Sequence, residues 1–103
     1  MWAQLITVRV KQGGVEGVER IMNRLREAEQ PGSGLIRQIV TRDQADPQVI
    51  RTLAVFESEE MARARESDPR RAEAHRETQA IFAEILDGPP TFNSLDVVMA
   101  LDY

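Results

Sequence analysis

One histidine and a run of arginines are the residues of this sequence best suited to chemistry. His75 is the only histidine and lies in the stretch AEAHRETQAIF, residues 72–82. In a helix, His75 and Phe82 are two turns apart and share a face. An imidazole on that face could accept a proton or ligate a metal, and the alternative is a histidine at the edge of the core with one hydrogen bond. The inward stripe of this helix would be Ala72, His75, Gln79, Phe82, Ile85 and Leu86.

The run RARESDPRRAEAHRE, residues 63–77, holds most of the charge near this histidine. Such a density of charge favours a solvated helix face. The alternative is a basic rim that attracts an anionic ligand to the site. That rim would consist of Arg63, Arg65, Arg70 and Arg71.

Other kinds of catalytic site find little support. A single histidine excludes a multi-histidine metal site within one chain, and the absence of cysteine excludes thiol nucleophiles and thiolate ligands. The glycines at 13–14 and 32–34 do not form a phosphate loop, because the first pair lacks the Lys-Ser/Thr ending and the second group follows a helix. The sequence therefore predicts no metal site.

Composition indicates one soluble globular domain spanning residues 1–103. The apolar share is 42% and the charged share 29%, both ordinary values. A net charge of −4 argues against nucleic-acid binding. No apolar run reaches about 18 residues, which predicts no membrane-spanning helix, and the N-terminal stretch lacks the pattern of a secretory signal. We therefore expect a cytoplasmic protein.

Hydrophobic periodicity divides the chain into six elements. Alternation of apolar and polar residues predicts a strand over 2–11, and a content rich in β-branched residues predicts one over 35–42. Two further strands, apolar on both sides, are expected over 49–57 and 92–101. A period of 3.6 predicts a helix from Val15 up to the QPGSG sequence at 30–34. A second helix is expected to begin after Ser58 as N-cap, to be interrupted by the SDP sequence at 67–69, and to end near Asp87.

The order β-α-β-β-α-β predicts an α+β, ferredoxin-like domain. Its four antiparallel strands would form one sheet, with the two helices on one face. The third and last strands, however, carry apolar residues on both sides: Leu53 and Val55 oppose Ala54 and Phe56. Since the helices cover only one face, a second copy of the chain is the economical cover for the other. We therefore expect a homodimer; the alternative is a monomer with a partly apolar open face.

The stretches PGSGLIRQIVTRD and VIRTLAVFESEEMARARESDPRRAEAHRETQAIFAEILDGPPTFNSLDVV resemble the antibiotic biosynthesis monooxygenase (ABM) domain family. The most telling features are the strand that ends in an aromatic before ESEE, the SDP break, and GPP before the last strand. The resemblance implies a dimeric α+β barrel. It also implies cofactor-free oxidation of aromatic polyketide or quinol-type substrates, or, in a related branch, haem degradation.

The resemblance to the haem-degrading branch also implies positions for a site. The branch's axial histidine falls at or beside His75, its tryptophan position is held by Arg65, and its asparagine position by Ile6 or Thr7. Trp2 and Phe56 could line a flat pocket, although aromatics at strand ends are more often core residues.

Three functions remain open from the sequence. The first is a cofactor-independent monooxygenase for a small aromatic substrate, with His75 as base. The second is a haem-binding or haem-degrading protein with His75 as axial ligand. The third is a homodimer that binds a small ligand without catalysis. The residues expected to contact the substrate are Ile6, Thr7, Arg65, Gln79 and Phe82.

Overall fold

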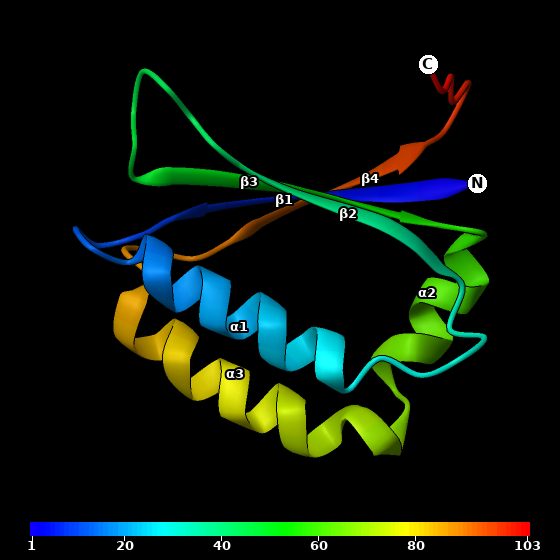
Figure 1. Cartoon of the computed structure of the whole chain (residues 1–103), viewed down its shortest axis with the longest axis horizontal. Helices are drawn as coiled ribbons and strands as arrows, with labels where there is room; N and C mark the ends of the chain where they lie inside the picture. Colours follow the sequence, from blue (N-terminus) through cyan, green and yellow to red (C-terminus); the bar gives the residue numbers. More distant parts are fainter.

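The computed structural model describes all residues, 1–103, as one sheet with helices on one side (Figure 1). The elements are β1 (Trp2–Arg9), α1 (Val15–Glu27), β2 (Leu35–Arg42), β3 (Val49–Phe56), α2 (Glu59–Glu66), the 3₁₀ turn η1 (Pro69–Arg71), α3 (Ala72–Ile85) and β4 (Thr91–Asp96). The predicted ferredoxin-like order is confirmed, including the division of the second helix at the SDP sequence.

The sheet has the strand order β2-β3-β1-β4, and all neighbouring strands are antiparallel. In the central pair, Trp2 lies opposite Phe56 and Ile6 lies opposite Thr52. Directly opposite residues share a face of the sheet. Alternate residues of β1 and β3 therefore point together toward the helices, with the remainder on the other side.

The core between sheet and helices consists of two clusters of buried side chains. The first comprises Trp2, Ala54, Phe56 and Ala62, and the second comprises Val8, Val10, Val18 and Ile50. Thr52, itself buried, lies on β3 between the residues of the two clusters. The prediction that Leu53 and Val55 face away from Ala54 and Phe56 is confirmed, and so is the core placement of Trp2 and Phe56.

Helix caps form where the sequence predicts them. The Ser58 hydroxyl accepts a hydrogen bond from the Met61 amide at 3.1 Å and begins α2. The Asp68 carboxylate accepts one from the Arg70 amide at 2.9 Å and begins η1, with Pro69 in the first position. These side chains satisfy amide groups that a helix start leaves without partners, so the chain turns sharply between α2 and α3.

The face of α3 that packs inward differs from the prediction. Ala74 and Thr78 are buried, whereas Ala72, His75 and Gln79 are exposed. The stripe therefore runs through residues 74, 78, 81 and 85, one position away from the expected one. The physical reason is the contact with α1, where a Cβ on Gly17 would lie 2.9 Å from Ile85 Cγ2, so this glycine lets the two helices approach closely.

The last strand is shorter than predicted. β4 ends at Asp96, whose partner is Trp2, the first residue of β1. Beyond that pair only the Met1 carbonyl remains, and it accepts a hydrogen bond from the Val97 amide at 3.2 Å. Residues 97–103 therefore have no neighbouring strand and adopt no regular structure.

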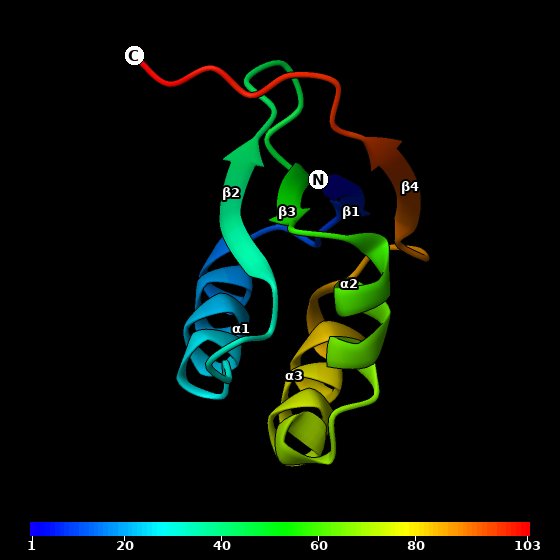
Figure 2. The same cartoon turned by 90° about the vertical axis from the view of Figure 1, so that its right-hand side faces the viewer.

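The other face of the sheet carries no helix, and residues 97–103 lie on that side (Figures 1 and 2). We call it the open face, and its apolar members are Leu5, Ile39, Leu53, Val55 and Leu95. Ile39 and Leu95 are exposed, and Val98, Met99 and Leu101 of the C-terminal segment are more exposed still. None of the helices is of a length and apolarity that would cross a membrane.

Candidate functional site

His75 lies on the outward side of α3. Its side chain is exposed, and it borders neither of the two hollows described below. The expectation that it faces the space between helix and sheet is therefore wrong. Phe82, two turns further along, is half-buried because it lies nearer to the packed stripe. Gln79 is exposed beside it.

The residues expected on the first strand are separated from the rest. Ile6 points toward the helices and packs against the second core cluster, while Thr7 belongs to the opposite side of the sheet. Arg65 lies over Phe56, and Phe56 pairs with Trp2, four residues from Ile6. At about 3.3 Å per residue that is about 13 Å along the strand. These six predicted residues therefore do not form one pocket.

Two core aromatics and two arginines form a stack at one end of the sheet. The rings of Trp2 and Phe56 are 5.8 Å apart and tilted by 46°. The Arg63 guanidinium lies 5.2 Å from the Trp2 ring centroid, and that of Arg65 lies 5.6 Å from the Phe56 centroid. Cations at these distances are attracted by the faces of aromatic rings. The last turn of α2 is thus attached to the first core cluster.

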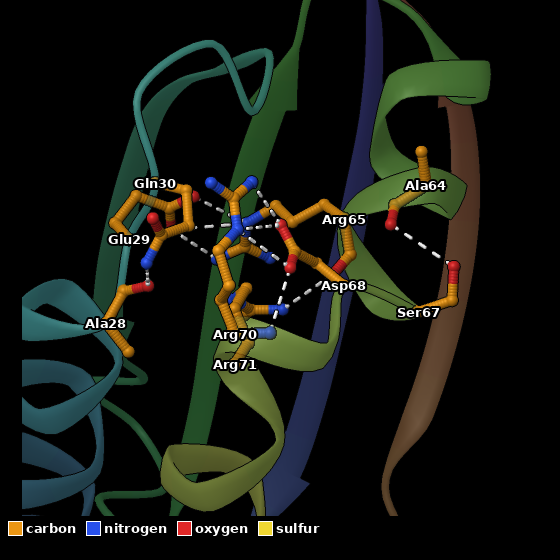
Figure 3. A network of polar contacts seen from close by, with 9 residues as sticks. All are labelled: Ala28, Glu29, Gln30, Ala64, Arg65, Ser67, Asp68, Arg70 and Arg71. Atoms are coloured by element: carbon orange, nitrogen blue, oxygen red, sulfur yellow. Dashed lines mark hydrogen bonds and ion pairs between the residues drawn. The ribbon is translucent and has the colours of Figure 1, made fainter.

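Arg65 is held from its other side by Glu29. Its Nη2 lies 2.6 Å from Glu29 Oε1 and its Nε lies 2.9 Å from Glu29 Oε2. Burial raises the pKa of Glu29, but the hydrogen bonds from Arg65 and Ser33 outweigh burial, so the pKa lies below its ordinary value. A forked pair of this kind fixes both side chains. It joins the end of α1 to α2 (Figure 3).

A hollow of about 250 Å³ opens beside this pair, and we call it the arginine hollow. Its walls are the 30–33 loop, Met61 and Ala64 of α2, and the charged side chains Arg65, Asp68, Arg70 and Arg71. Figure 3 shows the arginines and Asp68 converging there. Only two lining residues are hydrophobic. The hollow is therefore suited to a polar group.

The charges of the hollow are unevenly paired. Asp68 binds Arg70 through both carboxylate oxygens, and the Arg70 bonds lower the Asp68 pKa to about 2. Arg71 is only 7% exposed and forms no ion pair. Its Nη1 donates to the Arg65 carbonyl at 3.2 Å, and its Nε donates to no protein acceptor.

A second hollow of about 410 Å³ lies between α1 and β2. Its walls include Met22, Leu35, Ile36 and Val40, together with the polar residues Asn23, Arg26, Glu29, Arg37 and Gln38. Glu29 borders this second hollow, and its partner Arg65 borders the arginine hollow. In neither do His, Asp and Glu side chains gather in the group of three that a metal ion would need.

The sequence matches the family model described as antibiotic biosynthesis monooxygenase over residues 1–80. The chain belongs to this family, as the resemblance in its sequence indicated. Among curated proteins, none matches the chain at a significant level. The family description supports a monooxygenase-like role and leaves the substrate open.

Solved structures show the same fold. A proposed antibiotic biosynthesis monooxygenase from Caulobacter crescentus superposes with a TM-score of 0.76 at 18% identity, covering 95% of this chain and 90% of that one. A proposed member from Nitrosomonas europaea gives 0.75 at 12% identity, covering 96% and 100%. A variant of SnoaB, a cofactor-independent oxygenase from Streptomyces nogalater, gives 0.73 at 14% identity, covering 99% and 97%.

The sequence predicted that most of the arginine run lies on a solvated helix face, but two of its arginines are removed from solvent. Arg65 is half-buried against Phe56 and Glu29, and Arg71 beside it is buried. A signal for Arg71 existed: the buried stripe of α3, extended back by three residues from Ala74, reaches position 71. No local signal pointed to Glu29, which is 36 residues from Arg65.

Proposed function

We propose that this protein is a cofactor-independent monooxygenase that acts on a small aromatic substrate of the quinol or polyketide type. The observation that carries the proposal is its membership of the monooxygenase family over residues 1–80. The shared fold with SnoaB, described as a cofactor-independent oxygenase, adds support. The substrate would lose two hydrogens, one ring carbon activated by the phenol would gain one oxygen atom from O₂, and the second oxygen atom would leave as water with those two hydrogens.

His75 is the proposed general base that removes the substrate proton. Its ring is accessible on the outer side of α3, so a substrate would reach it from solvent. The residues that the sequence suggests for substrate contact are Ile6, Thr7, Arg65, Gln79 and Phe82, and these do not line one pocket. Of these five, Arg65 is the one that borders the arginine hollow.

The active assembly proposed is a homodimer. The support is the open face, where Leu5, Leu53 and Val55 lie on the side of the sheet that no helix covers (Figure 2). A two-fold axis would place the same face of each copy against the other, so the patch would cover itself. The C-terminal segment 97–103, with exposed apolar side chains on the same side, would contribute to that interface.

The test is oxygen uptake with a panel of hydroquinones and anthrone-type phenols, without added metal, flavin or haem. Substrate-dependent uptake above the protein-free rate is expected, with one ¹⁸O atom from ¹⁸O₂ in the product. A flat trace across the panel would overturn the proposal. His75→Ala is expected to lower the rate at least about 100-fold, whereas Glu84→Ala, an exposed change on the same helix, should not. Equal rates for both variants would remove His75 from the mechanism.

A further inference from the structure

Arg71 is a buried cation whose surroundings are incomplete. Its side chain is 93% removed from solvent, yet the Nε–H group has no protein acceptor. A buried polar group without a partner costs free energy, and a buried charge without one costs more. Burial lowers the pKa of Arg71, and the neighbouring Arg65 lowers it further.

The nearby carboxylates are already engaged. Glu29 pairs with Arg65, and Asp68 pairs with Arg70, each through more than one hydrogen bond. Three guanidinium groups therefore face two carboxylates around one hollow, which leaves one positive charge in excess. The unmatched charge is that of Arg71, the most buried of the three.

The hollow offers space for the missing counter-charge. It measures about 250 Å³, and Arg71 forms part of its wall together with the Gly32 and Ser33 backbone. A Cβ on Gly34 would lie 2.7 Å from Met61 Cβ. The glycine therefore lets the 30–33 loop close against α2, which shapes the hollow without filling it.

We propose that the arginine hollow binds an oxyanion group, either a carboxylate or a phosphate, with Arg71 as the principal donor. A guanidinium donates two parallel hydrogen bonds to either group. The small polar lining suits a charged group and not an aromatic ring. This binding requires no oxidation, so it stands or falls independently of the monooxygenase activity.

The test is thermal unfolding of the whole chain in inorganic phosphate and in acetate, against chloride at equal ionic strength. At an anion concentration ten times the dissociation constant, the Tm of the wild type should rise by about 5 °C or more. Phosphate also stabilises proteins without binding them. Arg71→Met is therefore compared at every concentration, since it keeps the volume and removes the donors.

In Arg71→Met the saturable part of the shift should disappear, while Arg20→Met, on the exposed side of α1, should retain it. The variant should be at least as stable as the wild type in chloride, because an unpaired buried charge is removed. A shift with phosphate alone or acetate alone supports the proposal and names the group that binds. Equal shifts in Arg71→Met and wild type, or none in the wild type, overturn it.

A second measurement needs no variant. In a nitrogen-15 spectrum, the Nε–H signal of Arg71 should move and saturate as either anion is added, with the same midpoint as the Tm effect. The Nε–H signal of Arg63, which lies over Trp2, should stay in place. Movement of all arginine signals together, without saturation, would indicate screening by salt alone and would contradict the site.

Discussion

Arg65 and Glu29, 36 residues apart in the chain, form a two-pronged ion pair with a shortest distance of 2.6 Å. Their side chains are 10% and 23% exposed, so water screens them little. The pair binds the end of α1 to α2, and Arg71 lies immediately beside it. Removing the Glu29 carboxylate would leave Arg65 and Arg71 side by side without an ion-pair partner.

Glu29→Gln is therefore expected to reduce the free energy of unfolding by about 2 kcal/mol. The amide keeps the size of the side chain but no longer neutralises Arg65. Glu77→Gln makes the same change in the pair with Arg24, where the side chains are 47% and 31% exposed, and should cost clearly less because water screens that pair. Urea unfolding at pH 7 measures both, and equal losses would contradict the structure.

The cost of Glu29→Gln should depend on pH. The pKa of Glu29 in the folded protein lies below its ordinary value of 4.5. The unfolded chain therefore takes up the proton first as pH falls, so the stability from this carboxylate is complete above pH 4.5 and declines below it.

The difference in unfolding free energy between wild type and Glu29→Gln should thus be smaller at pH 3 than at pH 7. Asp43 and Asp68, whose pKa values lie at about 2 because of their arginine partners, are present in both proteins and cancel. Urea midpoints at the two pH values give the comparison. If the difference in unfolding free energy is the same at both pH values, protonation of Glu29 does not weaken its pair with Arg65, and the prediction is wrong.

Two glycines of the same loop should respond differently to alanine. Gly34 has φ +85°, and an added Cβ would meet Met61 Cβ at 2.7 Å, so strain and a clash act together. Gly32 has φ +76° with nothing within 4 Å. We expect Gly34→Ala to cost about 3 kcal/mol and Gly32→Ala about 1 kcal/mol. Thermal or urea unfolding distinguishes them, and equal costs would mean that the loop does not pack tightly on α2.

The proposed homodimer is tested by adjacent residues of β2 that belong to opposite faces. Ile39, 39% exposed, belongs to the open face, and Val40, 43% exposed, to the helix side. Ile39→Glu would bury a charge in the interface, at about 2 kcal/mol per copy, and should yield monomers. Val40→Glu should remain dimeric. Sedimentation velocity over a concentration series decides, and a wild-type monomer at micromolar concentration would refute the dimer.

Most of the fold could be predicted from local patterns. β2 spans residues 35–42, as its content of β-branched residues predicts. Ser58 and Asp68 cap helices as their positions indicate. The last strand could not be predicted, because its length is set by where β1 begins, and Asp96 is the last residue with a strand partner. A strand needs a hydrogen-bonded neighbour, and the neighbour of β4 is β1, at the other end of the chain.

Less of the site could be predicted, for a related reason. His75 was a candidate because it is the only histidine. Its two-turn spacing from Phe82 predicted which face of the helix packs inward. The face that packs is instead the one on which Ile81 and Ile85 meet Gly17 of α1, and Ala74 and Thr78 are buried on the same stripe. The pairing of Arg65 with Glu29 depends on tertiary structure alone. A charged run can therefore hold both solvated and buried members.

The division of the core at Thr52 has a consequence for how the molecule unfolds in part. Ala62 of α2 belongs to the cluster around Trp2 and Phe56, whereas Val18 of α1 belongs to the other one. Partial unfolding follows such boundaries. Amide protons of α2 and η1 should exchange with deuterated solvent before those of α1. The entrance to the arginine hollow therefore lies in the part of the molecule that unfolds locally.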